Sequence, residues 1–237
     1  QIQGFRTVCA VELDLFCATI LAQRQNDQQL EPFPIWSDVE TFDPFPWRGI
    51  VDLVSGGFPC QDLSIAGRRK GLQGSKSGLW SHMLRIISAI QPRNVFIENS
   101  PNLVVQGLDR IICQLAKLGL DVIWGCFRAD ALGAPHKRNR VFILGDARIS
   151  RHRNKARKIC AGGFSVKFPG LGQGWETSNS KGRAPEPCMG RIVDGVPFGV
   201  DRLRALGNAQ VPIVAAYAFQ TLKARLEYYR AGGSMND

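Results

Sequence analysis

The sequence predicts an α/β protein in which helices cover a mostly parallel β-sheet. Short apolar runs rich in β-branched residues alternate with longer segments of helical periodicity over the first 147 residues. The centres of such runs are apolar, as at 95–97, which is typical of strands that are buried on both faces of a sheet. The regular alternation of strand and helix favours parallel strands joined by helical crossovers.

Each expected strand is a β-branched or apolar run with a recognisable end. The run at 7–13 ends in acidic residues, and the run at 49–57 is stopped by two glycines. Three further strands are expected at 94–99, 121–127 and 140–145.

The expected helices have amphipathic periodicity and clear stop signals. The first covers 15–24, and the second covers 80–92 and ends at Pro92. A third is expected at 103–119, with Gly119 at its C-terminus. The last, at 211–229, is long enough to pack back on the sheet.

The periodic pattern stops after Ala147, and this divides the chain. We expect a catalytic core at 1–147, a short basic recognition region at 148–195, a returning segment at 196–230 and a tail at 231–237. Residues 148–191 hold ten Lys or Arg against two acids, so this window carries +8 of the net charge of +10. Such a window fits a nucleic-acid contact surface or, equally, a solvated basic loop.

The composition narrows the class of protein. No stretch reaches the roughly eighteen apolar residues of a membrane span, and no signal peptide is visible, so we expect a cytoplasmic protein without membrane contact. The seven cysteines include no CxxC pair and the three histidines are scattered, so no metal site is expected. Four cysteines in apolar patterns are expected to be buried thiols, namely Cys9, Cys17, Cys113 and Cys126.

Three expected strands carry chemically suggestive side chains at their ends or in the turn that follows: Glu12, Cys60 and Glu98. In an open parallel sheet such groups gather where the strands end. A fourth strand is preceded by the basic run 136–140. A thiol nucleophile, a carboxyl group and a cation together suit attack on an electron-poor ring, with the acid bound to a ring nitrogen and the cation to an oxygen.

Five segments resemble the DNA (cytosine-5)-methyltransferases. "GGFPCQDLSIAGRRKGL" is similar to that family's Pro-Cys-Gln segment, and "FIENSPNL" to its Glu-Asn-Val segment. "HKRNRVFIL" resembles its Gln-x-Arg-x-Arg segment, "RLRALGNAQVP" its Gly-Asn segment, and "AVELD" the strand end that binds the cofactor ribose. Their order and spacing agree over residues 4–220. The resemblance implies a Rossmann-like S-adenosylmethionine-dependent methyltransferase sheet with helices on both faces.

The resemblance implies a catalytic role for four residues. Cys60 would attack C6 of cytosine, Glu98 would bind N3 and the exocyclic amine, and Arg140 would hold O2, with Arg138 beside it. Each has a simpler alternative: Cys60 could be an inert buried thiol, Glu98 a salt-bridge partner, and the arginines a solvated strand start.

The same resemblance implies contacts with S-adenosylmethionine and double-stranded DNA. Glu12 would bind the ribose and Asp38 the adenine amine, although a lone acid at a strand end is more often a surface residue. Asn208 would lie near the cofactor, unless it is a C-capping residue. The other expected cofactor contacts are Val39, Pro59 and Leu79. The expected DNA contacts are Gln61, Ser64, Arg68, Arg69, Lys70, Arg151, Arg153, Lys155, Arg157 and Lys158.

One family segment has no counterpart here, the first strand with its Gly-x-Gly loop. The chain begins with Gln, so we expect either a fragment of a longer reading frame or a degenerate protein, and a monomer in both cases. The resemblance implies that the missing strand belongs between the strand ending at Glu12 and the strand at 49–57. Without it these two strands would not pair with each other and would lie roughly 10 Å apart. Three functions stay open: a DNA cytosine methyltransferase, an inactive DNA-binding remnant, and an RNA-methylating relative.

Overall fold

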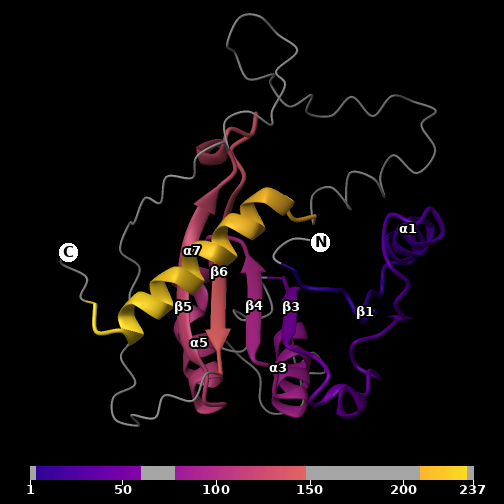
Figure 1. Ribbon diagram of the computed structural model, residues 1–237, viewed down its shortest axis with the longest axis horizontal. Coiled ribbons are helices and arrows are strands. Elements are labelled where there is room, and N and C mark those ends of the chain that lie inside the picture. The colour runs from indigo at the N-terminus through magenta and orange to yellow at the C-terminus, as the bar shows by residue number, and fades with distance from the viewer. Residues whose placement is uncertain (1–3, 60–77, 148–208, 234–237) are drawn as a thin grey trace, which may run out of the picture.

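The computed structural model describes residues 4–59, 78–147 and 209–233 of the 237-residue chain. These residues form one four-stranded sheet with helices on both faces, and a separate two-stranded sheet (Figure 1). The α/β fold predicted from the sequence is therefore confirmed.

The elements follow the predicted order, with shifts at their ends. The strands are β1 (Ala10–Val11), β2 (Ile35–Trp36), β3 (Leu53–Gly57), β4 (Asn94–Asn99), β5 (Asp121–Arg128) and β6 (Asn139–Asp146). The helices are α1 (Leu15–Asn26), α3 (Leu79–Ile90), α4 (Leu103–Gln106), α5 (Leu108–Lys117) and α7 (Pro212–Arg230), with single 3-10 turns η1 (Phe45–Trp47) and η2 (Asp130–Leu132).

The four-stranded sheet has the order β3-β4-β6-β5. β3 and β4 are parallel, whereas β6 runs antiparallel to both β4 and β5. The expectation of a mostly parallel sheet therefore needs a correction, because one reversed strand makes the sheet mixed. A short connection through η2 joins β5 to β6, and such a connection suits antiparallel neighbours.

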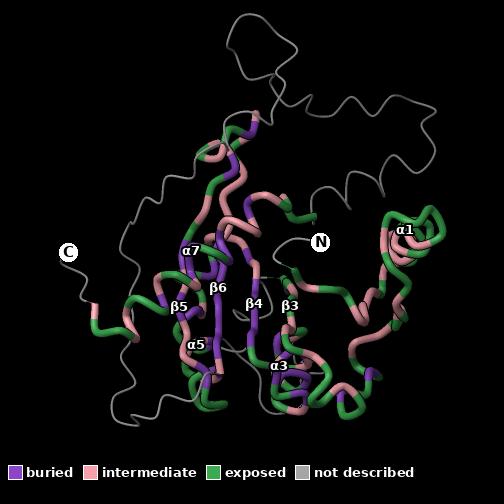
Figure 2. Tube along the Cα trace, viewed as in Figure 1, coloured by how far each residue is buried: buried purple, intermediate pink, exposed green. Residues whose placement is uncertain are grey.

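Alternate residues of β4 face two separate cores. Val95 and Ile97 pack with α3, α4 and α5 on one face, while Phe96 packs with α7 on the other. α7 crosses the face of the sheet that is toward the viewer in Figure 1, and the buried residues concentrate along β4 and β6 in Figure 2. Both faces of the central strands are covered, which explains the apolar stretches 95–97 of β4 and 141–144 of β6.

β1 and β2 form a small parallel sheet of their own. Within the described residues β1 is not hydrogen-bonded to β3, so the prediction that these strands do not pair is confirmed. Their separation of roughly 10 Å stays a prediction. α1, which follows β1, contains no buried residue (Figure 2).

Two further expectations were wrong. The helix expected at 103–119 is broken at Gly107, whose φ of 155° lies outside the helical region. The four cysteines expected to be buried are not: Cys9 and Cys17 are half-buried, and Cys113 and Cys126 are exposed. Cys126 alternates with the buried Gly125 along β5, so its side chain points to the other face. Of the helices in the described ranges, none combines the length and apolar character that crossing a membrane requires.

Candidate active site

A buried acid and an arginine meet where β4 ends and β6 begins. Glu98 is the second-last residue of β4, and Arg140 is the second residue of the antiparallel neighbour β6. Arg140 Nε lies 2.8 Å from Glu98 Oε1, and only 11% of the Glu98 side chain is exposed. The two groups that were predicted to bind the base are therefore in direct contact.

Burial dominates the electrostatics of this pair. Desolvation raises the pKa of Glu98 above its ordinary value of 4.5, although the charges of Arg140 and Arg138 act in the opposite direction. Burial, together with the like charge of Arg140, lowers the pKa of Arg138. A carboxyl group with a raised pKa is easier to protonate, so it can donate a hydrogen bond as well as accept one.

Glu98→Gln should become more stable relative to the parent as the pH rises. Between 4.5 and the raised pKa, folded parent still binds a proton that the unfolded chain has lost, so the parent loses stability with increasing pH. Glutamine does not titrate, so the difference should grow from about pH 4.5 and level off above the folded pKa. Urea unfolding of both proteins from about pH 4 to about pH 8 measures it.

Asp130→Asn serves as a control of opposite sign. The hydrogen bond from Arg128 lowers the pKa of Asp130 below 3.8, so in a urea series extended down to about pH 2 this variant should lose stability relative to the parent as the pH rises toward 3.8. If the relative stability of Glu98→Gln fell with rising pH, the arginines would outweigh burial and our account of the pair would be wrong.

The polypeptide approaches Cys60 along a path fixed beside Glu98. Gly57 pairs with Glu98 in the parallel ladder, and a Cβ at position 57 would lie 3.1 Å from the carbonyl oxygen of Glu98 and 3.3 Å from its Oε2. A side chain at position 57 would require Glu98 to shift by a few tenths of an ångström, so glycine suits this close approach of β3 to β4. Asn99 Nδ2 then donates to the carbonyl oxygen of Phe58 over 2.7 Å, inside the core. Both contacts precede the exposed Pro59, which Cys60 follows directly in the sequence.

Phe58 also connects the two described ends of the chain that flank residues 60–77. Its ring lies 5.3 Å from that of Trp80, in the first turn of α3. Trp80 Nε1 in turn donates to Gln114 Oε1 on α5 over 2.7 Å. Pro59 and Gly78 are thus held near the same buried ring contact.

Arg138 contacts the main chain before α7. Its Nη2 donates to the carbonyl oxygen of Ala209, which follows Asn208 in the sequence. The start of β6 is thereby joined to the segment that leads into α7. The catalytic role predicted for Arg138 stays a prediction, and this contact indicates that the residue also ties two segments together.

The described residues expected to bind the cofactor lie after β1, after β2, after β3 (the exposed Pro59) and at the start of α3. Glu12 directly follows β1, and its Oε1 accepts a hydrogen bond of 2.8 Å from the amide of Asp14. Asp38 lies two residues after β2, where its Oδ1 accepts from the amide of Glu40 at 2.8 Å. Val39 is half-buried, and Leu79, the first residue of α3, is 42% exposed.

Several predicted site residues lie outside the described residues. They are Cys60, Gln61, Ser64, Arg68, Arg69, Lys70, Arg151, Arg153, Lys155, Arg157, Lys158 and Asn208. The recognition region expected at 148–195 lies outside them as well, and its role stays a prediction.

Sequence reasoning missed the roles of Gly57 and Asn99. Both contacts join β3 to β4, and the two strands are about forty residues apart in the chain. The glycine pair at 56–57 looked like a stop signal, and Asn99 looked like the end of a strand. The signal that could have found them is the alignment of the two strand ends in a parallel pair.

The fold and this site define an α/β domain in which a carboxyl group and two arginines meet near the carboxyl end of β4. Residues 1–162 match the family described as C-5 cytosine-specific DNA methylase. The chain belongs to this family.

Relatives of known name agree with this assignment. The type II methyltransferase M.CviJI of Paramecium bursaria Chlorella virus IL3A is 30% identical over 203 residues, which are 85% of this chain and 50% of that protein. The type II methyltransferase M.PspPI of Psychrobacter sp. (strain TA137) is 34% identical over 148 residues, 60% of this chain and 34% of the relative. The chain thus spans half or less of these two proteins.

Among solved structures, the S. pombe Dnmt2 methyltransferase can be superposed on this chain; the match covers 63% of this chain and 46% of the Dnmt2 chain. The TM-score is 0.49 and the identity 17%.

Proposed function

We propose that the protein is a DNA (cytosine-5)-methyltransferase that transfers a methyl group from S-adenosylmethionine to C5 of cytosine. The observation that carries this proposal is the Glu98–Arg140 pair, which lies beside Gly57, three residues before Cys60 in the sequence. An acid and a cation that meet at the strand end from which the sequence leads to a cysteine suit attack on a pyrimidine ring.

Cys60 is the nucleophile in this proposal. Its thiolate adds to C6, which breaks the aromaticity of the ring and makes C5 electron-rich enough to accept a methyl group. Glu98 binds N3 and the exocyclic amine, and Arg140 binds O2, so both stabilise charge that develops on the ring as the C6–S bond forms. Loss of the C5 proton to a base then expels the Cys60 thiolate and restores the ring.

Glu98 suits this role because it is buried yet close to two arginines. In its protonated form it can donate a hydrogen bond to N3, and its raised pKa increases the population of that form at neutral pH. Arg140 holds Glu98 Oε1 from the side, which fixes the direction of the carboxyl group.

The residues after β1, after β2 and at the start of α3 fit S-adenosylmethionine. An acid such as Glu12 suits the two ribose hydroxyls, and Asp38 suits an exocyclic amine. The exposed apolar side chain of Leu79 suits the face of a purine ring. When bound, the cofactor supplies the methyl group.

Double-stranded DNA is the proposed substrate. The net charge of +10 favours contact with a polyanion, and its concentration in residues 148–191 favours phosphate contacts there. C5 and C6 of a paired cytosine are inaccessible to a thiol inside the stack, so the base has to be flipped out of the duplex.

The test is transfer of a tritiated methyl group from S-adenosylmethionine to nucleic acid, by the 237-residue chain and in parallel by a version extended at its N-terminus with a glycine-rich loop. We expect label in cytosine-containing duplex DNA and none in a duplex whose cytosines are replaced by 5-methylcytosine. Label in RNA but not in DNA would contradict the substrate class. Tight DNA binding with no transfer to either would identify an inactive binding protein instead.

A further inference from the structure

Arg85, on the second turn of α3, binds two main-chain carbonyl groups of the turn that follows β2. Its Nη1 donates to the carbonyl oxygen of Phe42 over 2.9 Å, and its Nη2 donates to that of Val39 over 2.8 Å. These carbonyls lie at the two ends of a four-residue turn. The planar guanidinium group can reach both at once, which a lysine ammonium on a flexible stem does less well.

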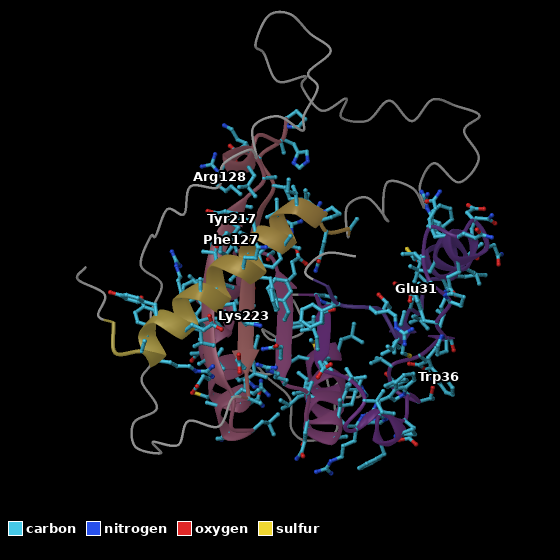
Figure 3. The ribbon with its side chains drawn as sticks, viewed as in Figure 1. Glu31, Trp36, Phe127, Arg128, Tyr217 and Lys223 are labelled. Carbon is cyan, nitrogen blue, oxygen red and sulfur yellow. The ribbon has the colours of Figure 1, made fainter. Side chains whose placement is uncertain are left out.

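The turn between Val39 and Phe42 begins directly after Asp38. Inside it, the Asp38 carboxylate accepts from the amide of Glu40, and Thr41 Oγ1 donates to the carbonyl oxygen of Asp38 over 3.2 Å. Trp36 Nε1, whose ring is labelled in Figure 3, donates to Thr41 Oγ1 over 3.1 Å. These bonds set the shape of the turn but do not fix it to α3.

Contacts between the turn and α3 are apolar as well as polar. The buried Phe42 packs with Ile86 and Ile90. His82 Nε2 lies 4.0 Å from Glu40 Oε1, and that carboxylate is largely exposed. Apolar packing sets how far the turn lies from the helix, whereas the paired hydrogen bonds of Arg85 set its orientation.

α3 begins with Leu79, so one helix carries an expected cofactor contact and also the group that orients two others. We propose that Arg85 is the positioning residue for the adenosine end of the cofactor site, holding Asp38 and Val39 in place relative to Leu79. This inference rests on the proposed function, because it takes those three residues as cofactor contacts.

The experiment measures ligand affinity and local structure in the 237-residue chain. Isothermal calorimetry gives the dissociation constants of S-adenosylhomocysteine and of adenosine for the parent, Arg85→Ala, Arg85→Lys and Arg110→Ala. Amide hydrogen exchange of residues 39–42 without ligand reports on the turn itself. Arg110 is the matched control, since it is an exposed arginine on α5 and lies on a different helix.

For Arg85→Ala we expect both dissociation constants to rise by about fivefold, the equivalent of one hydrogen bond, and exchange at 39–42 to accelerate. The two ligands should weaken by the same factor because they share only the adenosine part. Arg85→Lys should fall between parent and Arg85→Ala, and Arg110→Ala should match the parent.

Three outcomes contradict the inference in distinguishable ways. Faster exchange with unchanged affinities would show that Arg85 stabilises the turn but does not contribute to ligand binding. Unchanged exchange would contradict the two hydrogen bonds. Failure of the parent to bind either ligand would count against the proposed function itself, and the role of Arg85 would fall with it.

Discussion

Replacing Cys60 by serine should abolish methyl transfer, by roughly 10³-fold or more, while DNA binding stays nearly unchanged. A serine hydroxyl is far less nucleophilic than a thiolate at neutral pH, and without a bond at C6 the ring does not become reactive at C5. The substitution belongs in whichever form of the protein transfers methyl groups, the 237-residue chain or a version extended at its N-terminus with a glycine-rich loop.

A duplex that contains 5-fluorocytosine gives the sharpest measurement for Cys60. Fluorine at C5 cannot leave as a proton does, so the covalent complex should accumulate with the parent and survive denaturing electrophoresis. Cys60→Ser should give no such complex. Cys126→Ser is the matched control, because Cys126 is an exposed thiol on β5, and it should form as much complex as the parent. Activity retained in Cys60→Ser would exclude this cysteine as the nucleophile.

Arg230→Met should lower the free energy of unfolding by about 3 kcal/mol, because it removes the cation beside the fully buried carboxylate of Asp146. Asp121 and Asp146 lie opposite each other at the end of the β5–β6 pair, and Asp146 is fully buried. Arg230, the last residue of α7, donates to Asp121 Oδ2 over 2.6 Å and lies 3.5 Å from Asp146 Oδ1. Without it, two carboxylates face each other across a ladder.

Urea unfolding measures this prediction, with Lys223→Met as the control on the same helix. The Lys223 ammonium lies 5.6 Å from the centre of the Phe219 ring (Figure 3 labels Lys223), and its removal should cost about 1 kcal/mol or less. Asp121→Asn combined with Arg230→Met should recover part of the loss by removing the repulsion. A cost for Arg230→Met equal to that of Lys223→Met would show that the ion pairs of Arg230 contribute little.

How much of the fold was visible in the sequence depends on the element. β4 was predicted to the residue, because an apolar strand buried on both faces has a sharp composition boundary at each end. The predicted end of α3 was within two residues of the observed end, because Pro92, two residues beyond Ile90, stops the helix. β1 was predicted at 7–13 but spans only Ala10–Val11, because the length of a strand is decided by its neighbours and not by its own residues.

For the site, the sequence by itself determined which residue types follow which strands. Glu98 after an apolar strand and Arg140 at the start of another were both identified from local pattern and resemblance. Only the tertiary structure decided that these two side chains touch, because β6 runs antiparallel beside β4, with Phe142 opposite Glu98, and Arg140, two residues away along β6, reaches Glu98 with its side chain. Contacts between distant strands depend on register, which a linear pattern does not contain.

The same distinction applies to Cys60 on the one hand and to Gly57, Asn99 and Arg85 on the other. The sequence alone singled out Cys60, by its Pro-Cys context, and predicted that β1 and β3 do not pair. The tertiary structure decided the parts played by Gly57, Asn99 and Arg85, whose partners are 41 or more residues away in the chain. Glycine, asparagine and arginine occur at many turns and surfaces, so their residue type carries little information until packing brings a specific partner within hydrogen-bonding distance.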